Sequence, residues 1–277
     1  RMMVWGRRDH LLRVLAEPGL TSAQRERELL QLPMGNQVLY HGLEQFNGYS
    51  VADTSRRQPI DAWQKDDRAD ADMDALSAEL IRHRPLLDLG AVRYIISSTP
   101  LIAPGLRRVK DGPDAIYENL EAAPMAYLAS KALSVPDRQT ALQAVLAGAR
   151  SQRPAWIEAQ GPFGSASGTV RFLNRQDQRW ELEVQAKGGP ATLVLSRLYY
   201  DGLWQATVDG ERVPLWPANA CFTALPVPMG SHRVLLMPAP GPLRLRQFVF
   251  LLGLFLTLAL LWLGRPIQTT LPALESA

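Results

Sequence analysis

Alternation of polar and apolar residues is clearest over residues 178–185. Trp180, Leu182 and Val184 alternate there with charged or polar neighbours, so we expect one buried and one solvated face. Short apolar runs follow at intervals of about ten residues, a rhythm typical of an antiparallel β-sandwich. They occupy residues 191–197, 204–208, 211–215, 221–227 and 232–237. Asp209 and Gly210, between two of these runs, predict a two-residue type I′ hairpin turn.

The first part of the chain mixes helical and strand patterns. Apolar residues recur at helical spacing in residues 66–84, so we expect a helix that Pro85 interrupts. Residues 92–96 predict a buried strand, with 115–119 as its short partner. The remaining expected elements are helices at 21–32 and 137–150 and strand material at 38–40. The sequence therefore predicts an α+β fold, with a mixed α/β part at 1–155 and a β-sandwich at 156–240.

An uncharged apolar run follows the sandwich, from residue 248 to residue 264. As an α-helix it would span roughly 25 Å, slightly less than the hydrocarbon layer of a bilayer. We therefore predict a transmembrane helix at 247–264 and a short tail at 265–277. The alternative is a helix buried in a soluble core, but the run is apolar on every face.

Composition narrows the class of protein. The net charge is only +3 and the arginines are scattered, which excludes a nucleic-acid-binding stripe. Cys221 is the single cysteine, so no intrachain disulfide can form, and we expect a buried, inert thiol. The chain begins at Arg1. It is interpreted either as the C-terminal piece of a longer membrane protein or as a nearly complete chain anchored by its tail, with its soluble part in the cytosol.

Motif searches give no catalytic residue and no metal site. The four histidines lack metal-ligand spacing, and the glycine-rich stretch 161–168 lacks the Gly-Lys-Ser/Thr ending of a phosphate loop. We interpret that stretch as a flexible connector. Aromatic residues gather around the sandwich turns, where they predict either a platform for sugars or ordinary core packing. They are Tyr199, Tyr200, Trp204 and Trp216.

Three segments together resemble the C-terminal part of the bacterial YfhO family of polytopic membrane proteins. They are LLDLGAVRYIIS at 86–97, IYENLEAAPMAYL at 116–128, and the long stretch at 193–234 that contains the Asp209-Gly210 turn. Asn36 and Tyr49 are similar to a further stretch upstream. In this family glycine and tryptophan are usually adjacent, whereas here Leu203 separates Gly202 from Trp204.

The resemblance implies a function that the residues do not themselves show. Proteins of this family resemble C-class glycosyltransferases, which transfer a sugar from a polyprenyl-phosphate carrier to an acceptor glycan of the cell envelope. The catalytic acid would then lie outside this chain. This chain would cover the catalytic site or orient the acceptor. Tyr49 and the four sandwich aromatic residues are the candidate binding residues. The implied location is the cell membrane, with the soluble part extracytoplasmic. The local charges favour the opposite orientation, because two arginines, Arg244 and Arg246, precede the apolar run and only Arg265 follows it. The rival interpretation is a non-catalytic, membrane-anchored β-sandwich binding module. The sequence predicts no cofactor within this chain.

Overall fold

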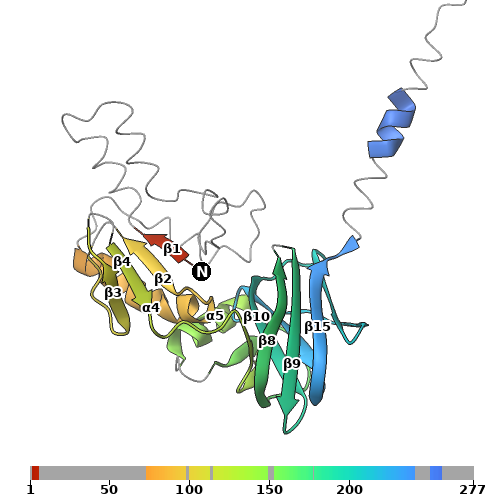
Figure 1. Ribbon diagram of the computed structural model, residues 1–277, viewed down its shortest axis with the longest axis horizontal. Helices are drawn as coiled ribbons and strands as arrows, with labels where there is room; N and C mark the ends of the chain where they lie inside the picture. Colours follow the sequence, from red (N-terminus) through yellow and green to blue (C-terminus); the bar gives the residue numbers. More distant parts are fainter. Residues whose placement is uncertain are drawn as a thin grey trace, which may run out of the picture.

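The computed structural model describes residues 2–5, 73–97, 100–112, 115–148, 153–176, 178–240 and 250–257. Three sheets, the helices α4 and α5, and a separate helical segment at 250–257 make up this part of the chain (Figure 1). The elements expected at 21–32 and 38–40, together with Tyr49, lie outside the described residues.

Two sheets form the sandwich. The six-stranded sheet has the order β5-β10-β14-β13-β7-β6. Its strands are β5 (Ala126–Leu128), β6 (Ala132–Ser134), β7 (Ala155–Ile157), β10 (Ala191–Leu198), β13 (Trp216–Ala218) and β14 (Phe222–Val227). The five-stranded sheet has the order β12-β11-β15-β9-β8. Its strands are β8 (Ser167–Gln176), β9 (Arg179–Lys187), β11 (Trp204–Val208), β12 (Glu211–Val213) and β15 (Gly230–Pro238). The first sheet thus includes strands that precede residue 156.

Alternation along β9 produces the core between the two sheets, as the sequence predicts. Trp180, Leu182 and Val184 are buried there against residues of β10 and β14. The exception is Glu181, which the pattern places on the solvated face but which is only 9% exposed. Arg233 of the neighbouring strand β15 covers it and donates a hydrogen bond to its carboxylate. The predicted α+β fold with a β-sandwich is confirmed.

A second core lies on the other face of the six-stranded sheet. It joins the helices α4 (Met73–Leu89) and α5 (Arg138–Ala147) to that sheet through one buried cluster. The cluster also takes in residues of a third sheet, of order β1-β2-β4-β3. Its strands are β1 (Met2–Trp5), β2 (Tyr94–Ser97), β3 (Leu106–Lys110) and β4 (Ala115–Asn119). The antiparallel pairing of β2 with β4 confirms the predicted partnership.

Pro85 does not end the first helix, and here the sequence-based expectation is wrong. Helix α4 continues through Pro85 to Leu89. Proline inside a helix costs about 3 kcal/mol, because it removes a hydrogen bond and crowds the preceding turn. Leu86 and Leu87, which follow it, are completely buried. Burying two leucines contributes roughly 3–6 kcal/mol, enough to offset that cost.

The hairpin predicted at Asp209 and Gly210 is confirmed. Both residues have positive φ angles, 52° and 93°, as a type I′ turn requires. The Asp209 carboxylate accepts hydrogen bonds from the backbone N–H of Arg233 at 2.7 Å and from Nδ1 of His232 at 2.6 Å. The other ring nitrogen of His232 lies 3.2 Å from the carbonyl oxygen of Met229, which can only accept. Both nitrogens therefore carry hydrogen, and the protonated ring is favoured.

Residues 250–257 are helical, within the predicted membrane span. Their large side chains are exposed, with Phe250 at 70% and Phe255 at 68%. Among the residues that the structure describes, none of the helices has both the length and the hydropathy needed to cross a bilayer. The other residues of the span lie outside the described part, so the transmembrane helix stays a prediction.

Candidate binding groove

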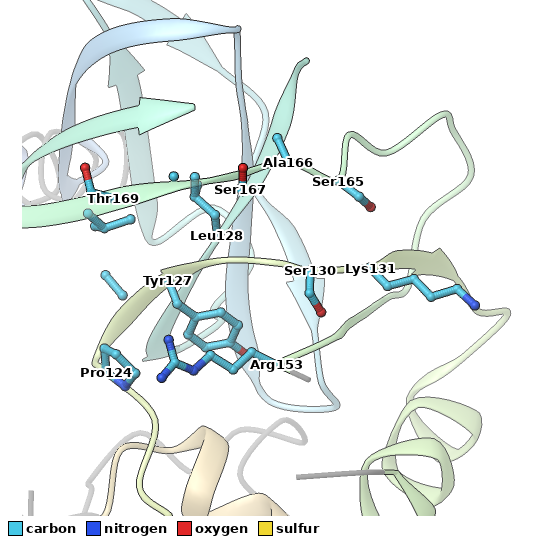
Figure 2. Close-up of a pocket in the computed structure, with 13 residues that line it drawn as sticks. Pro124, Tyr127, Leu128, Ser130, Lys131, Arg153, Ser165, Ala166, Ser167 and Thr169 are labelled. Atoms are coloured by element: carbon cyan, nitrogen blue, oxygen red, sulfur yellow. The ribbon is translucent and has the colours of Figure 1, made fainter. Parts of the chain in front are cut away.

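An open groove of about 940 Å³ lies where the edge of one sandwich sheet meets the edge of the other. Strand β5 forms one wall and the start of β8 forms the other (Figure 2). Each of these two strands has a single neighbour in its sheet, so each leaves one edge unpaired among the described strands. The polar side chains that line the groove are Tyr127, Ser130, Lys131, Arg153, Ser165, Ser167 and Thr169.

The β5 wall presents backbone groups as well as side chains. Ala129 donates its N–H to Thr192 of β10 at 2.9 Å, and Ser196 donates to the carbonyl of Met125 at 2.8 Å. Since hydrogen-bonding direction alternates along an antiparallel strand, Ala126 and Leu128 direct their N–H and C=O groups away from β10. The groove therefore offers a short row of backbone donors and acceptors to an extended ligand.

The opposite wall depends on Gly168 at the start of β8. A Cβ atom at this position would lie 1.8 Å from the carbonyl oxygen of Gln185 and 2.9 Å from Cδ1 of Leu128. Only glycine therefore lets β8 approach both its partner β9 and the β5 wall this closely. A side chain here would push the two walls apart.

Arg153 is held at the edge of the groove by a fixed backbone. Its φ angle is +42°, and its carbonyl oxygen accepts a hydrogen bond from the N–H of Ser130 at 3.3 Å. Asn219 fixes the residues that follow, because its side chain donates to the Pro154 carbonyl at 3.2 Å and accepts from the Trp156 N–H at 2.9 Å. The Arg153 side chain is exposed, and no ion pair holds it within the described residues.

Tyr127 forms the floor beside Arg153. Figure 2 shows the guanidinium of Arg153 next to the Tyr127 ring and Pro124, with Lys131 extending toward the other side. The phenol oxygen accepts a hydrogen bond from Nδ2 of Asn219 at 3.1 Å. Burial raises the pKa of Tyr127 well above its ordinary value, so the phenol stays neutral. The charged groups lining this groove are thus two cations, Lys131 and Arg153, and they favour a ligand that carries negative charge.

A second, smaller hollow of about 450 Å³ lies on the other side of Arg153. Asp88 and Glu121 are among the residues that line it. Behind it, the buried Asn119 side chain donates to Oδ1 of Asp88 at 2.7 Å and accepts from the Arg84 guanidinium at 3.0 Å. These bonds tie α4 to β4, and Arg84 also forms an ion pair with Glu121 at 3.5 Å, so both acidic residues of this hollow have a structural role.

The structure separates the aromatic residues that the sequence grouped together. Trp204 packs against the core between the sheets, and the Arg197 guanidinium lies 4.3 Å from its ring centroid. Trp216 packs against the core on the helix side, where its ring meets that of Phe163 with centroids 5.0 Å apart. Tyr199 and Tyr200 lie in the connection between β10 and β11. The two tryptophans do not form one platform, and sugar binding by these aromatic residues stays a prediction.

The sequence did not predict the groove. The stretch 161–168, interpreted as a connector, supplies Ser165, Ser167 and Gly168 to its wall. Lys131 and Arg153 lie in short polar segments without any recognisable motif. These residues line one groove because the edges of two different sheets lie side by side, and no local sequence pattern indicates which strand edges adjoin.

Comparisons with known protein families, with curated protein sequences and with solved structures find no match to this chain. The resemblance to the YfhO family therefore stays a prediction that rests on the order and spacing of its motifs.

Proposed function

We propose that this chain is the membrane-anchored, extracytoplasmic region of a glycosyltransferase-like protein, and that its groove binds an acidic glycan of the cell envelope as the acceptor. The observation that carries the proposal is the groove itself, whose unpaired strand edges and hydroxyl groups flank two cations, Lys131 and Arg153. The order of the motifs that resemble the YfhO family supports the wider assignment to a transferase.

An extended glycan suits this groove for two physical reasons. Sugar hydroxyls both donate and accept hydrogen bonds, as do the backbone edge of β5 and the side chains of Ser130 and Ser167. Carboxylate or phosphate groups along the glycan form charge-assisted bonds with Arg153 and Lys131, and such bonds are roughly twice as strong as neutral ones. The groove is open, so a long polymer can enter without threading.

The role proposed for this chain is to hold and orient the acceptor. The sugar would come from a polyprenyl-phosphate carrier, and the catalytic acid would belong to residues outside this chain. A second candidate is a membrane-anchored module that binds the glycan without catalysis. Among the described residues, the side chains that line the groove include neither a carboxylate nor an imidazole to serve as a general base, which fits binding without catalysis as well as it fits acceptor binding beside a catalytic site outside this chain.

Binding of acidic glycans to the full chain tests the proposal. Arg153→Gln removes the fixed cation, and we expect the affinity for a polyuronate to fall about 10-fold or more, since hydrogen bonds to charged groups contribute about 1.5–3 kcal/mol. Arg212→Gln is the matched control, because Arg212 is exposed on β12, at the opposite edge of the five-stranded sheet. Equal affinity of both variants and the unaltered chain would refute the assignment of the groove.

An assay of sugar transfer by the full-length protein separates the two candidates. For an acceptor-orienting region, Arg153→Gln raises the KM for the acceptor and leaves kcat nearly unchanged. Glycan binding without any transfer would support the non-catalytic module. Binding of neither acidic nor neutral glycans would exclude both.

A further inference from the structure

The chain leaves the sandwich toward the apolar helix at the end of β15, and hydrogen bonds join this corner to the neighbouring connection between β10 and β11. Strand β15 ends there, with Pro238 opposite Trp204 in the antiparallel register. The N–H of Ala239 donates a hydrogen bond of 2.8 Å to the carbonyl of Leu203. Leu203 belongs to the connection between β10 and β11, residues 199–203, which we call the exit loop. The exit loop and the departing chain are therefore fixed side by side.

The side chains of the exit loop suit the boundary between lipid and water. Leu203 is 40% exposed although it is apolar, and Tyr199 and Tyr200 are half-buried. The Tyr199 hydroxyl lies 3.3 Å from a carboxylate oxygen of Asp201 and can donate to it. Tyrosine prefers the headgroup level of a membrane because its ring is apolar and its hydroxyl is polar. Gly202 has a φ angle of +66°, which lets the loop turn back sharply.

The apolar helical segment follows at short range. Phe250 comes ten residues after Pro240, so the two lie within roughly 35 Å of each other even if the chain between them is fully extended. The six largest apolar side chains of that segment are all exposed, and on a membrane-anchored chain they would lie in lipid. The corner at which the chain leaves the folded body is then the point by which that body is tethered, within roughly 35 Å of the membrane-anchored segment.

We infer that the exit loop rests in the headgroup layer of a lipid bilayer, with Leu203 and Tyr200 dipping into its surface, so that the sandwich stands on the membrane at the end where β15 finishes. This inference rests on the membrane anchorage proposed above and is independent of the glycan. It assigns Tyr199 and Tyr200 a lipid partner in place of the sugar predicted from the sequence.

The structure offers a matched control position at the other end of the same strand. Met229 precedes β15, is apolar and is 63% exposed, and the nine residues of β15 place it about 30 Å from the exit loop. Cys221, the single native cysteine, is fully buried, so the unaltered chain reports the background of thiol labelling. Single substitutions Leu203→Cys, Met229→Cys and Phe255→Cys then give three reporter positions.

The experiment uses the full chain in lipid nanodiscs, with a thiol-reactive fluorophore at each position and phosphatidylcholine that carries a nitroxide in its headgroup region or its acyl chain. We expect headgroup nitroxides to quench the label at 203, acyl-chain nitroxides to quench the label at 255, and neither to quench the label at 229. Quenching at 255 without quenching at 203 would overturn the inference and leave the anchorage intact. Absence of quenching at 255 would overturn the anchorage, and the inference with it. Equal quenching at 203 and 229 would also overturn it, since the sandwich would then lie flat.

Discussion

Removal of the Asn219 side chain should destabilise the fold and displace the edge of the groove together. Asn219 is completely buried and makes three side-chain hydrogen bonds, to the Tyr127 hydroxyl, the Pro154 carbonyl and the Trp156 N–H. An unsatisfied buried polar group costs about 1–3 kcal/mol, and Asn219→Ala leaves three of them. The φ angle of Asn219 is +51°, and alanine in this conformation costs about 1–2 kcal/mol more.

Because water can reach part of the groove and satisfy some of these groups, we expect a total loss of about 3–5 kcal/mol. That is a large share of the roughly 5–15 kcal/mol by which a domain is stable. Urea unfolding of the full chain, followed by tryptophan fluorescence, should show a lower midpoint with an unchanged slope. Asn219→Gly should be about 1 kcal/mol less destabilising than Asn219→Ala, because glycine adopts positive φ freely.

The matched control is Asn174→Ala, because Asn174 is exposed on β8 and makes no hydrogen bond through its side chain to another described residue. Its effect should lie within about 0.5 kcal/mol of zero. A loss below about 1 kcal/mol for Asn219→Ala would refute the reasoning, since a single unsatisfied buried group already costs that much.

Three further outcomes are expected. The hydrogen bond that the His232 ring donates to the Asp209 carboxylate raises the pKa of His232. Its stabilising contribution is therefore complete below the ordinary pKa of 6.5 and is lost as the pH rises through the raised value, so the unfolding midpoints of His232→Gln and the unaltered chain should converge at alkaline pH. Gly168→Ala should cost about 1–3 kcal/mol and weaken glycan binding, because its Cβ meets the carbonyl of Gln185; unaltered stability and affinity would contradict the close approach of the walls. Trp216→Phe should lower stability by about 1–3 kcal/mol and leave glycan affinity unchanged, which titration with a polyuronate would check.

The sandwich fold was predictable because the sequence signals for it, alternation of polar and apolar residues and a turn pair, each lie within a short segment. Burial on one face forces the alternation seen at Trp180, Leu182 and Val184, and positive φ at two successive residues favours a pair such as Asp209 and Gly210. Each of these signals is contained within a few residues. The six sandwich strands that the pattern predicted begin and end within two positions of their expected bounds, whereas β5, β6, β7, β8 and β13 were not predicted.

The errors and omissions come from contacts between distant segments. Helix α4 passes Pro85 because buried leucines beyond it outweigh the local penalty, and Glu181 is covered because Arg233 lies on the neighbouring strand. The groove brings Arg153 beside residues 165–170 through the order of strands in two sheets. Composition and periodicity carry no information about which strand edges adjoin.

The register of the five-stranded sheet sets the distance between the two proposed sites, the glycan groove and the exit loop. Gly168 pairs with Ala186, which pairs with Gly230 at the start of β15, whereas Leu203 bonds to the chain just beyond the end of β15. If the sandwich stands on a bilayer as inferred above, the length of β15 holds the proposed glycan groove about 30 Å above the lipid surface. A glycan shorter than that distance could not then reach the groove and the membrane at the same time, so the strand would set a minimum length for the acceptor.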